Sequence, residues 1–185
     1  MESESGVDED KVHTILITMI NAFKKMCVRI TDLATHVLLP HKSIFLINAY
    51  AKFINAFDAS PAEWTQPFIE DLTHIYMCEL DNLVHQEVAL MLTELGIAQP
   101  IQILDKYINT GGSLSPSTSL AQVSGMEPVE LAGVFKHFEA NLLNIRIIST
   151  LPQIDKIEDY SIRQMGRQSV FKLVTESYAR LYNAI

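Results

Sequence analysis

Apolar residues recur at intervals of three and four along most of this chain, which is the period of amphipathic helices. The longest stripe covers residues 8–39 and predicts one helix that Asp8 caps and Pro40 closes. A second helix is expected over Lys42 to Phe57, where apolar residues occupy more than one side. Such a helix is typically surrounded by other helices.

Three more helices follow from the same period. Ser60-Pro61 is a typical helix start, and the stripe after it runs to Gly96, which is a typical stop. A short segment over Pro100 to Thr110 and a helix over Glu127 to Leu143 come next. The residues of the latter that are expected to face inward are Val129, Leu131, Ala132, Phe135, Phe138 and Leu142.

A last helix is predicted from about Pro152 to Tyr182, and its apolar stripe has an irregularity. Its first side is marked by Ile154, Ile157, Ile162 and Met165, and at about 100° per residue it is rotated by roughly 140° from the side marked by Phe171, Val174, Tyr178, Leu181 and Tyr182. The change falls at Gly166. We therefore expect either a kink at this glycine or a second packing partner for the second half of the helix.

These elements predict an all-α chain of stacked antiparallel helices that form a bundle or a rod. Residues 1–7 read as an acidic disordered tail, and residues 8–185 as a single helical domain. Within that domain, the Gly- and Ser-rich run at 111–119 predicts a flexible surface loop.

Composition narrows the classes of function. A formal net charge of −8 opposes nucleic-acid phosphates, so no nucleic-acid partner is expected. No apolar run approaches the ~20 residues that cross a bilayer, and the N-terminus lacks the basic flank and apolar core of a signal peptide, so a cytosolic chain is expected. Cys27 and Cys78 stand among apolar neighbours and are predicted to be buried thiols.

The sequence predicts no catalytic, cofactor-binding or metal-binding residues. His74, Cys78 and His85 share one broad side of a helix, but the two histidines are roughly 16 Å apart along its axis, beyond the reach of one ion. The chain has no nucleophile elbow, and Gly111-Gly112 lacks the residues of a phosphate loop. A helical enzyme would need a cluster that forms only in three dimensions.

The last helix is the predicted partner-binding element. Its rotated stripe needs something to pack against, in this chain or another, and its basic residues suit an acidic partner or anionic lipid headgroups, or simply form a solvated face. The residues predicted to bind a partner are Arg163, Arg167, Phe171, Val174, Tyr178, Leu181 and Tyr182.

From about Lys42 to Ile185 the chain resembles the C-terminal part of subunit 6 of the conserved oligomeric Golgi complex. The resemblance is carried by an ordered set of apolar and helix-boundary positions. The set comprises Leu80-Asp81, Leu83-Val84, Leu92-Thr93, Gly96, Ser119-Leu120-Ala121, Glu127-Pro128-Val129, Leu131, Phe135, Phe138, Leu151-Pro152-Gln153, Leu173-Val174, Tyr178 and Leu181-Tyr182.

The resemblance implies a non-catalytic subunit of a vesicle-tethering complex, peripheral on the cytoplasmic face of the Golgi membrane and acting in intra-Golgi retrograde transport. Its implied partners are other subunits of the complex, together with SNAREs and small GTPases. Subunits of this family are several times longer than 185 residues. The alternative is an all-helical adaptor or small-molecule-binding domain, because the aromatic-rich segments Lys42 to Phe68 and Val129 to Phe138 could line a pocket.

Overall fold

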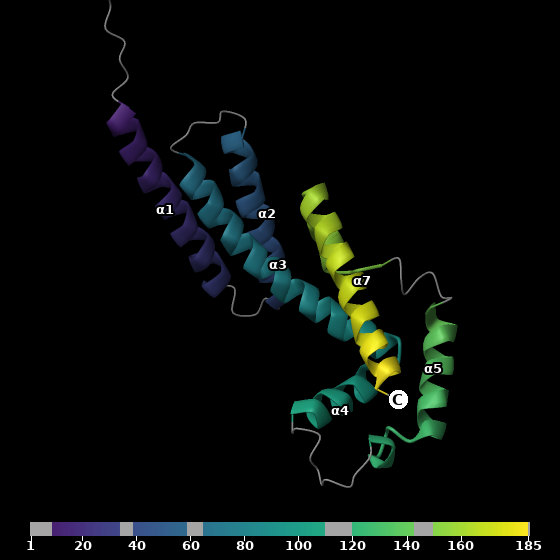
Figure 1. The fold of residues 1–185 in the computed structure, drawn as a ribbon. Coiled ribbons are helices and arrows are strands. Elements are labelled where there is room, and N and C mark those ends of the chain that lie inside the picture. Colours follow the sequence, from purple (N-terminus) through teal and green to yellow (C-terminus); the bar gives the residue numbers. More distant parts are fainter. Residues whose placement is uncertain (1–8, 34–38, 59–64, 110–119, 143–149, 185) are drawn as a thin grey trace, which may run out of the picture. The chain divides into compact units, whose positions relative to one another are not determined.

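The computed structural model describes residues 9–33, 39–58, 65–109, 120–142 and 150–184 (Figure 1). The described residues form helices and no strands, which confirms the all-α prediction. The α-helices are α1 (Glu9–Leu33), α2 (Leu39–Asp58), α3 (Gln66–Glu94), α4 (Ala98–Asn109), α5 (Pro128–Leu142) and α7 (Tyr160–Asn183), and the 3-10 turns are η2 (Leu120–Gln122) and η3 (Ile154–Lys156).

The chain divides into two compact units within α3, one up to Leu80 and one from Asp81 onward. The single helical domain expected over residues 8–185 stays a prediction beside this division. The acidic tail at 1–7, the cap at Asp8 and the loop at 111–119 lie outside the described residues and stay predictions.

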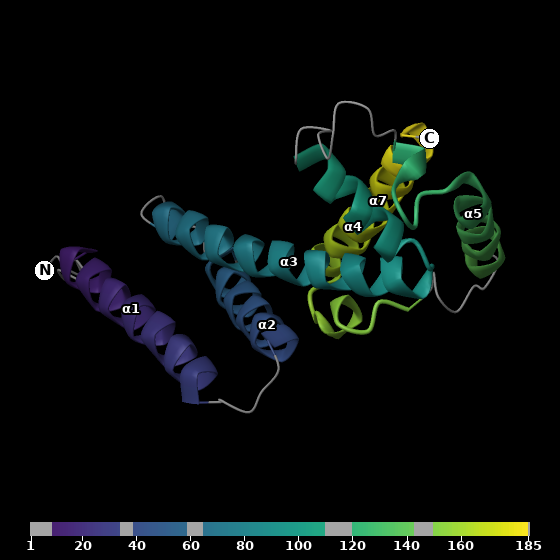
Figure 2. The same cartoon turned by 90° about the horizontal axis from the view of Figure 1, so that it is seen from below.

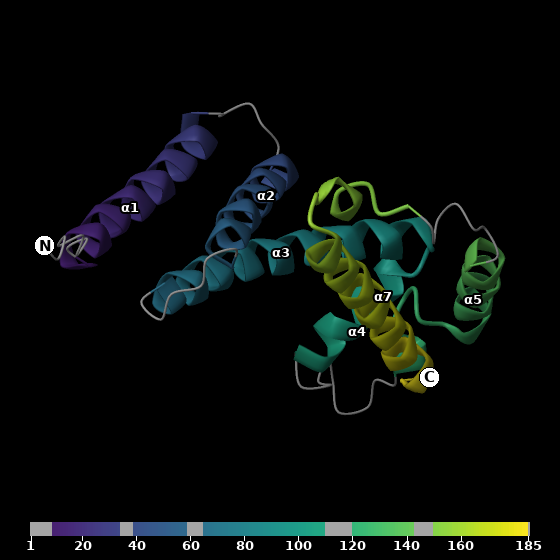
Figure 3. The same cartoon turned by 90° about the horizontal axis from the view of Figure 1, so that it is seen from above.

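The first unit is built from α1, α2 and the first half of α3 (Figure 3). Aromatic rings of α1 and α2 pack against one another in it. Phe23 of α1 stacks on Phe53 of α2 with ring centroids 4.4 Å apart. Beneath them Cys27, Tyr50 and Leu72 join one buried cluster. Lys24 of α1 forms an ion pair with Asp71 of α3, so the rim of this core is held by charge as well.

The second unit packs the end of α3 against α4, α5 and α7 (Figure 2). Its fully buried residues come from α3, from α7 and from the segments between helices, and they include Leu83, Leu95, Ile97, Met126, Leu151, Ile154, Ile157, Val170 and Leu181. Arg180 of α7 forms an ion pair with Asp105 of α4, and the Asn141 Nδ2 of α5 donates to the backbone oxygen of Glu94 at 3.1 Å.

Gly96 ends α3, as its position in the sequence predicts. It has φ 77°, the Gly96 N–H donates to the Thr93 oxygen, and the Ile97 N–H donates to the Leu92 oxygen, each at 3.0 Å. This is a Schellman motif, which requires a left-handed residue after the last helical turn. A Cβ at this position would lie 2.5 Å from the His137 Cδ2, so space as well as φ selects glycine.

Pro40 does not close the first helix. It is the second residue of α2, where its fixed φ suits the first turn and its missing N–H is not needed. Of the long stripe predicted over residues 8–39, the part up to Leu33 lies in α1 and Leu39 begins α2, whereas residues 34–38 lie outside the described part of the chain. The end of a helix before a proline and the start of one at a proline leave similar patterns in sequence.

The predicted last helix is also divided. Residues Ile154–Lys156 form a 3-10 turn, Ile157 is extended with ψ 123°, and α7 begins at Tyr160 with Asp159 as its cap. Because Ile154 and Ile157 lie outside the helix, the rotation predicted at Gly166 rests on Ile162 and Met165 alone. The helix α7 runs through Gly166 with one buried stripe, formed by Ile162, Gly166, Val170, Val174 and Leu181.

Two further predictions about burial are wrong. Of the residues of α5 that were expected to face inward, Leu131 and Phe138 are buried, whereas Val129, Ala132 and Leu142 are exposed. Cys27 is fully buried but Cys78 is exposed.

Candidate functional site

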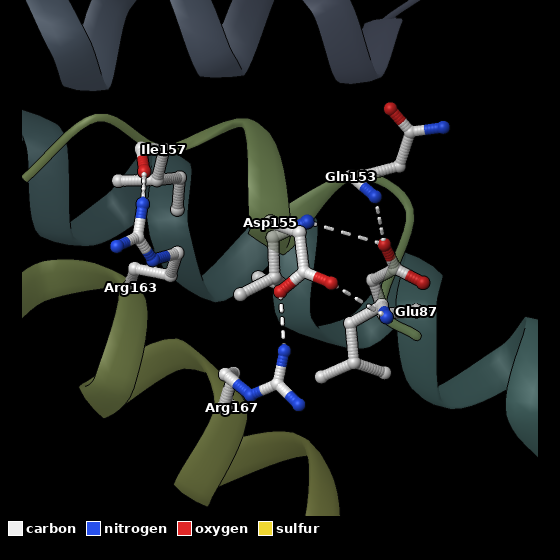
Figure 4. Close-up of polar contacts among 8 residues, drawn as sticks. Glu87, Gln153, Asp155, Ile157, Arg163 and Arg167 are labelled. Atoms are coloured by element: carbon white, nitrogen blue, oxygen red, sulfur yellow. Dashed lines mark hydrogen bonds and ion pairs between the residues drawn. The ribbon is translucent and has the colours of Figure 1, made fainter. Parts of the chain in front are cut away.

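A short turn before α7 is held in place by a buried carboxylate from α3 (Figure 4). Glu87 is 2% exposed, and its Oε1 accepts hydrogen bonds from the Gln153 N–H at 2.5 Å and the Ile154 N–H at 3.2 Å. Ile154 and Ile157 anchor the same turn in the core with no exposed surface. The buried N–H groups of this turn need an acceptor, and Glu87 supplies it.

A second set of polar contacts fastens the turn to α7 (Figure 4). The Asp155 carboxylate accepts from the Leu151 N–H at 3.1 Å and forms an ion pair with Arg167. Arg163 donates from Nη1 to the backbone oxygen of Ile157 at 2.8 Å. Both arginines predicted to bind a partner are thus engaged within their own unit, and a partner would compete with these contacts.

The remaining predicted binding residues fall into two groups. Val174 and Leu181 are 6% and 0% exposed, so they serve the core of the second unit. Phe171 and Tyr178 are half-buried, and Tyr182 is 63% exposed. Of the apolar and aromatic members of the predicted set, Phe171, Tyr178 and Tyr182 offer surface to a partner.

Aromatic rings join α5 to the end of α7. Tyr178 stacks on Phe138 with centroids 4.4 Å apart and an interplanar angle of 12°, and it meets the edge of Phe135 at 5.7 Å. Tyr182 lies 6.1 Å from Phe135 and extends the cluster outward. Aromatic pairs of this kind contribute about 0.5–1.5 kcal/mol beyond their burial, so they fix the relative position of the two helices.

A mostly apolar cavity of about 290 Å³ opens beside this cluster. Its walls come from α3, α5 and α7 and include Met91, Leu95, Phe138, Leu142, Phe171 and Val174. The Glu139 carboxylate and the Thr175 hydroxyl also belong to residues of its lining. A space of this volume and character suits an apolar side chain or a small apolar molecule.

The histidines and cysteines of α3 do not gather into a metal-binding group. His74 and Cys78 are exposed, and the Nδ1 of His85 lies 2.8 Å from the backbone oxygen of Asp81 on its own helix. Within the described residues, no three His, Cys, Asp or Glu side chains are arranged to hold a metal ion.

Glu87 is the structural residue that sequence reasoning missed. It stands four residues after Leu83 and four before Met91, on the face of α3 that both of them bury. A charge inside an apolar stripe signals a buried group with partners, because an unpaired buried carboxylate is very costly. That signal was present in the sequence, although it does not reveal that the partners are N–H groups 66 and 67 residues away.

In the described part of the chain, no single helix is long and apolar enough to span a membrane. By length and composition, α3 and α4 taken together would be sufficient for a span, but the two helices are bent by 116° at the break between them.

Comparison with known proteins gives one consistent result. The family model described as "Conserved Oligomeric Golgi complex subunit 6, C-terminal" matches residues 1–185. The conserved oligomeric Golgi complex subunit 6 of Dictyostelium discoideum is 23% identical over 170 residues, which are 90% of this chain and 24% of that protein. The chain thus spans about a quarter of the length of this relative, and no solved structure matches it significantly. This chain belongs to the family of the C-terminal region of conserved oligomeric Golgi complex subunit 6.

Proposed function

We propose that this chain acts as a non-catalytic module of a Golgi vesicle-tethering complex, through protein–protein contacts made by its helices. The match of the family model over residues 1–185 carries this proposal. The polar network of the second unit is consistent with it, because Glu87, Asp155, Arg163 and Arg167 are engaged in holding a turn rather than grouped around an open reaction site.

The finer parts of the proposal follow from the family. The module would work in intra-Golgi retrograde transport, peripheral on the cytoplasmic face of the Golgi membrane. Its partners would be other subunits of the complex, with SNAREs and small GTPases as further contacts. These assignments rest on the relationship to the family, and each needs its own test.

The surface that we assign to partner binding is the exposed end of the aromatic cluster. Tyr182 presents 63% of its surface there, beside Phe135 and Tyr178. Tyrosine is enriched among the residues that dominate protein interfaces, since it combines apolar area with a hydroxyl group. The other predicted residues would support this surface from within the unit.

The test is a pull-down of the tagged chain from its own cells, with the recovered subunits measured by mass spectrometry. We expect Golgi tethering subunits to be recovered, and the variant Tyr182→Ala to lower their recovery about tenfold, the effect of losing about 1.4 kcal/mol of binding. Tyr160→Ala is the matched control, because Tyr160 is 66% exposed at the other end of the same helix. Recovery of no tethering subunit by the unaltered chain would contradict the proposal.

The cavity of about 290 Å³ favours one second candidate, binding of a small apolar molecule. A thermal-shift screen with apolar compounds tests it, because a ligand that binds the folded state raises the melting temperature. Phe171→Ala should remove that shift, since Phe171 lines the cavity. A screen in which no compound raises the melting temperature would argue against this candidate.

A further inference from the structure

Helix α1 presents apolar side chains on two faces. One face is buried in the first unit through Ile20 and Cys27, which are 1% and 0% exposed. A second set is exposed, and we call it the α1 stripe: Ile15 (58%), Met19 (57%), Met26 (49%), Ile30 (43%) and Leu33 (82%). Within its unit α1 is an edge helix, with neighbours on one side (Figures 1 and 3).

The α1 stripe is continuous and narrow. At about 100° and 1.5 Å per residue, its five residues fall within an arc of roughly 60° and extend over about 27 Å. A stripe this narrow has the form of the seam between two packed helices, whereas a helix that lies in a membrane surface has a broad apolar face. It also contains no Trp or Phe, which such membrane helices typically use.

The charges beside the α1 stripe indicate which kind of helix could pack on it. Lys25 and Arg29 are exposed on one flank, and Asp32 is the acidic residue of that flank. Two copies of this chain paired antiparallel through the α1 stripe would bring these cations near each other, which is unfavourable. A helix with acidic residues beside its own apolar seam would be complementary.

We propose that the α1 stripe is the docking surface for an amphipathic, acidic-flanked helix of a separate protein. Burial of five exposed apolar side chains supplies the affinity, and Lys25 and Arg29 set the orientation of the incoming helix. This inference deepens the proposed function, and it rests on that function only in expecting the partner to be a subunit of the tethering complex.

The experiment uses photo-crosslinking from single cysteines on the purified chain. Cys78→Ser removes the exposed thiol, and Met19→Cys or Met26→Cys then places a benzophenone maleimide on the α1 stripe, while Cys27 stays buried. The labelled chains are irradiated in lysate from their own cells, and crosslinked peptides are identified by mass spectrometry. The unaltered chain labelled at Cys78 is the control, because that thiol lies on α3 of the same unit.

We expect both stripe probes to reach one peptide of a separate protein, at positions about seven residues apart, because Met19 and Met26 are two helical turns apart. That peptide should show an apolar stripe with acidic flanks. The Cys78 probe should not label it, and the double variant Lys25→Glu, Arg29→Glu should lower the crosslink yield about tenfold.

Several outcomes would overturn the inference. Crosslinks onto this chain or a second copy of it would do so, and so would labels scattered over many proteins. The third outcome is that the purified chain binds vesicles of phosphatidylcholine and phosphatidylserine and that Met26→Glu abolishes this binding. The two proposals can fail separately. If tethering subunits are recovered but the crosslinks are scattered, only the docking surface is contradicted. If the crosslink reaches one acidic-flanked helix of a protein outside the complex, only the proposed function is contradicted.

Discussion

Helices α1 and α7 are similar in length, but they use their apolar residues differently. In α7 the buried residues form one stripe that the second unit covers, and the ends of the helix are tied by the Asp159 cap and the ion pair of Arg180 with Asp105. In α1 the apolar residues are split between a buried face and the exposed α1 stripe. The buried stripe of α7 is therefore covered within its own chain, whereas the α1 stripe is not.

In sequence, both helices show apolar residues at threes and fours, and that spacing does not say which face a neighbour covers. Sequence reasoning assigned partner binding to the last helix because its stripe seemed to change sides. The structure gives α7 a single stripe and leaves the open apolar face on α1. Helical spacing identifies apolar faces, but the tertiary arrangement decides which of them remain exposed.

The largest expected difference between the two helices is the cost of removing a leucine side chain. Leu181→Ala should destabilise the second unit by about 3 kcal/mol, because a fully buried leucine leaves a cavity. Leu33→Ala, the same change at an 82% exposed position of α1, should alter stability by about 0.5 kcal/mol or less. Hydrogen exchange measured by mass spectrometry reports the stability of each of the two units separately. Similar losses at both positions would show that the α1 stripe is already covered in solution.

Glu87→Ala should destabilise the second unit by about 2 kcal/mol, because the Gln153 and Ile154 N–H groups would lose their charged acceptor. Faster exchange of these two amides than of the amides of α7 would locate the effect in the turn. Glu139→Ala is the control, since that carboxylate is exposed on α5. Unchanged protection of residues 153 and 154 would contradict the anchoring role of Glu87.

Much of the fold could be predicted from sequence because local rules decide it. Gly96 ends α3 as expected, and α5 (Pro128–Leu142) lies close to the predicted Glu127 to Leu143. The division of the predicted last helix was missed because Ile154 and Ile157 continue an apolar spacing while a carboxylate from α3 holds them in a turn. The partner-binding residues were harder still, since Val174, Tyr178 and Leu181 share a spacing and differ in burial only through α5 and its neighbours.

Two glycines should respond to the same substitution with opposite signs. Gly96→Ala should destabilise the second unit by about 1–2 kcal/mol, because φ 77° and the nearby His137 ring both oppose a Cβ. Gly133→Ala should stabilise it by about 0.5–1 kcal/mol, because Gly133 is inside α5 with nothing within 4 Å of the added atom. Melting temperatures of the two variants test this pair. A stable Gly96→Ala protein would mean that the Schellman turn is not needed to end α3.

The smallest expected effect on stability comes from a comparison of two neighbouring thiols, one on the buried face of α1 and one on its exposed face, which should differ in reactivity. Burial raises the pKa of the Cys27 thiol, so less thiolate forms there, and the surrounding side chains exclude reagent. In the Cys78→Ser background, Cys27 should therefore react with a thiol reagent only as fast as the first unit opens. Met26→Cys adds a thiol one residue away that should react at the rate of an exposed cysteine, with a change in stability of about 0.5 kcal/mol or less. Colorimetric thiol titration with and without urea distinguishes the two. Rapid modification of Cys27 in the folded protein would mean that α1 leaves its unit readily, and the α1 stripe would then have no fixed position from which to receive a partner helix.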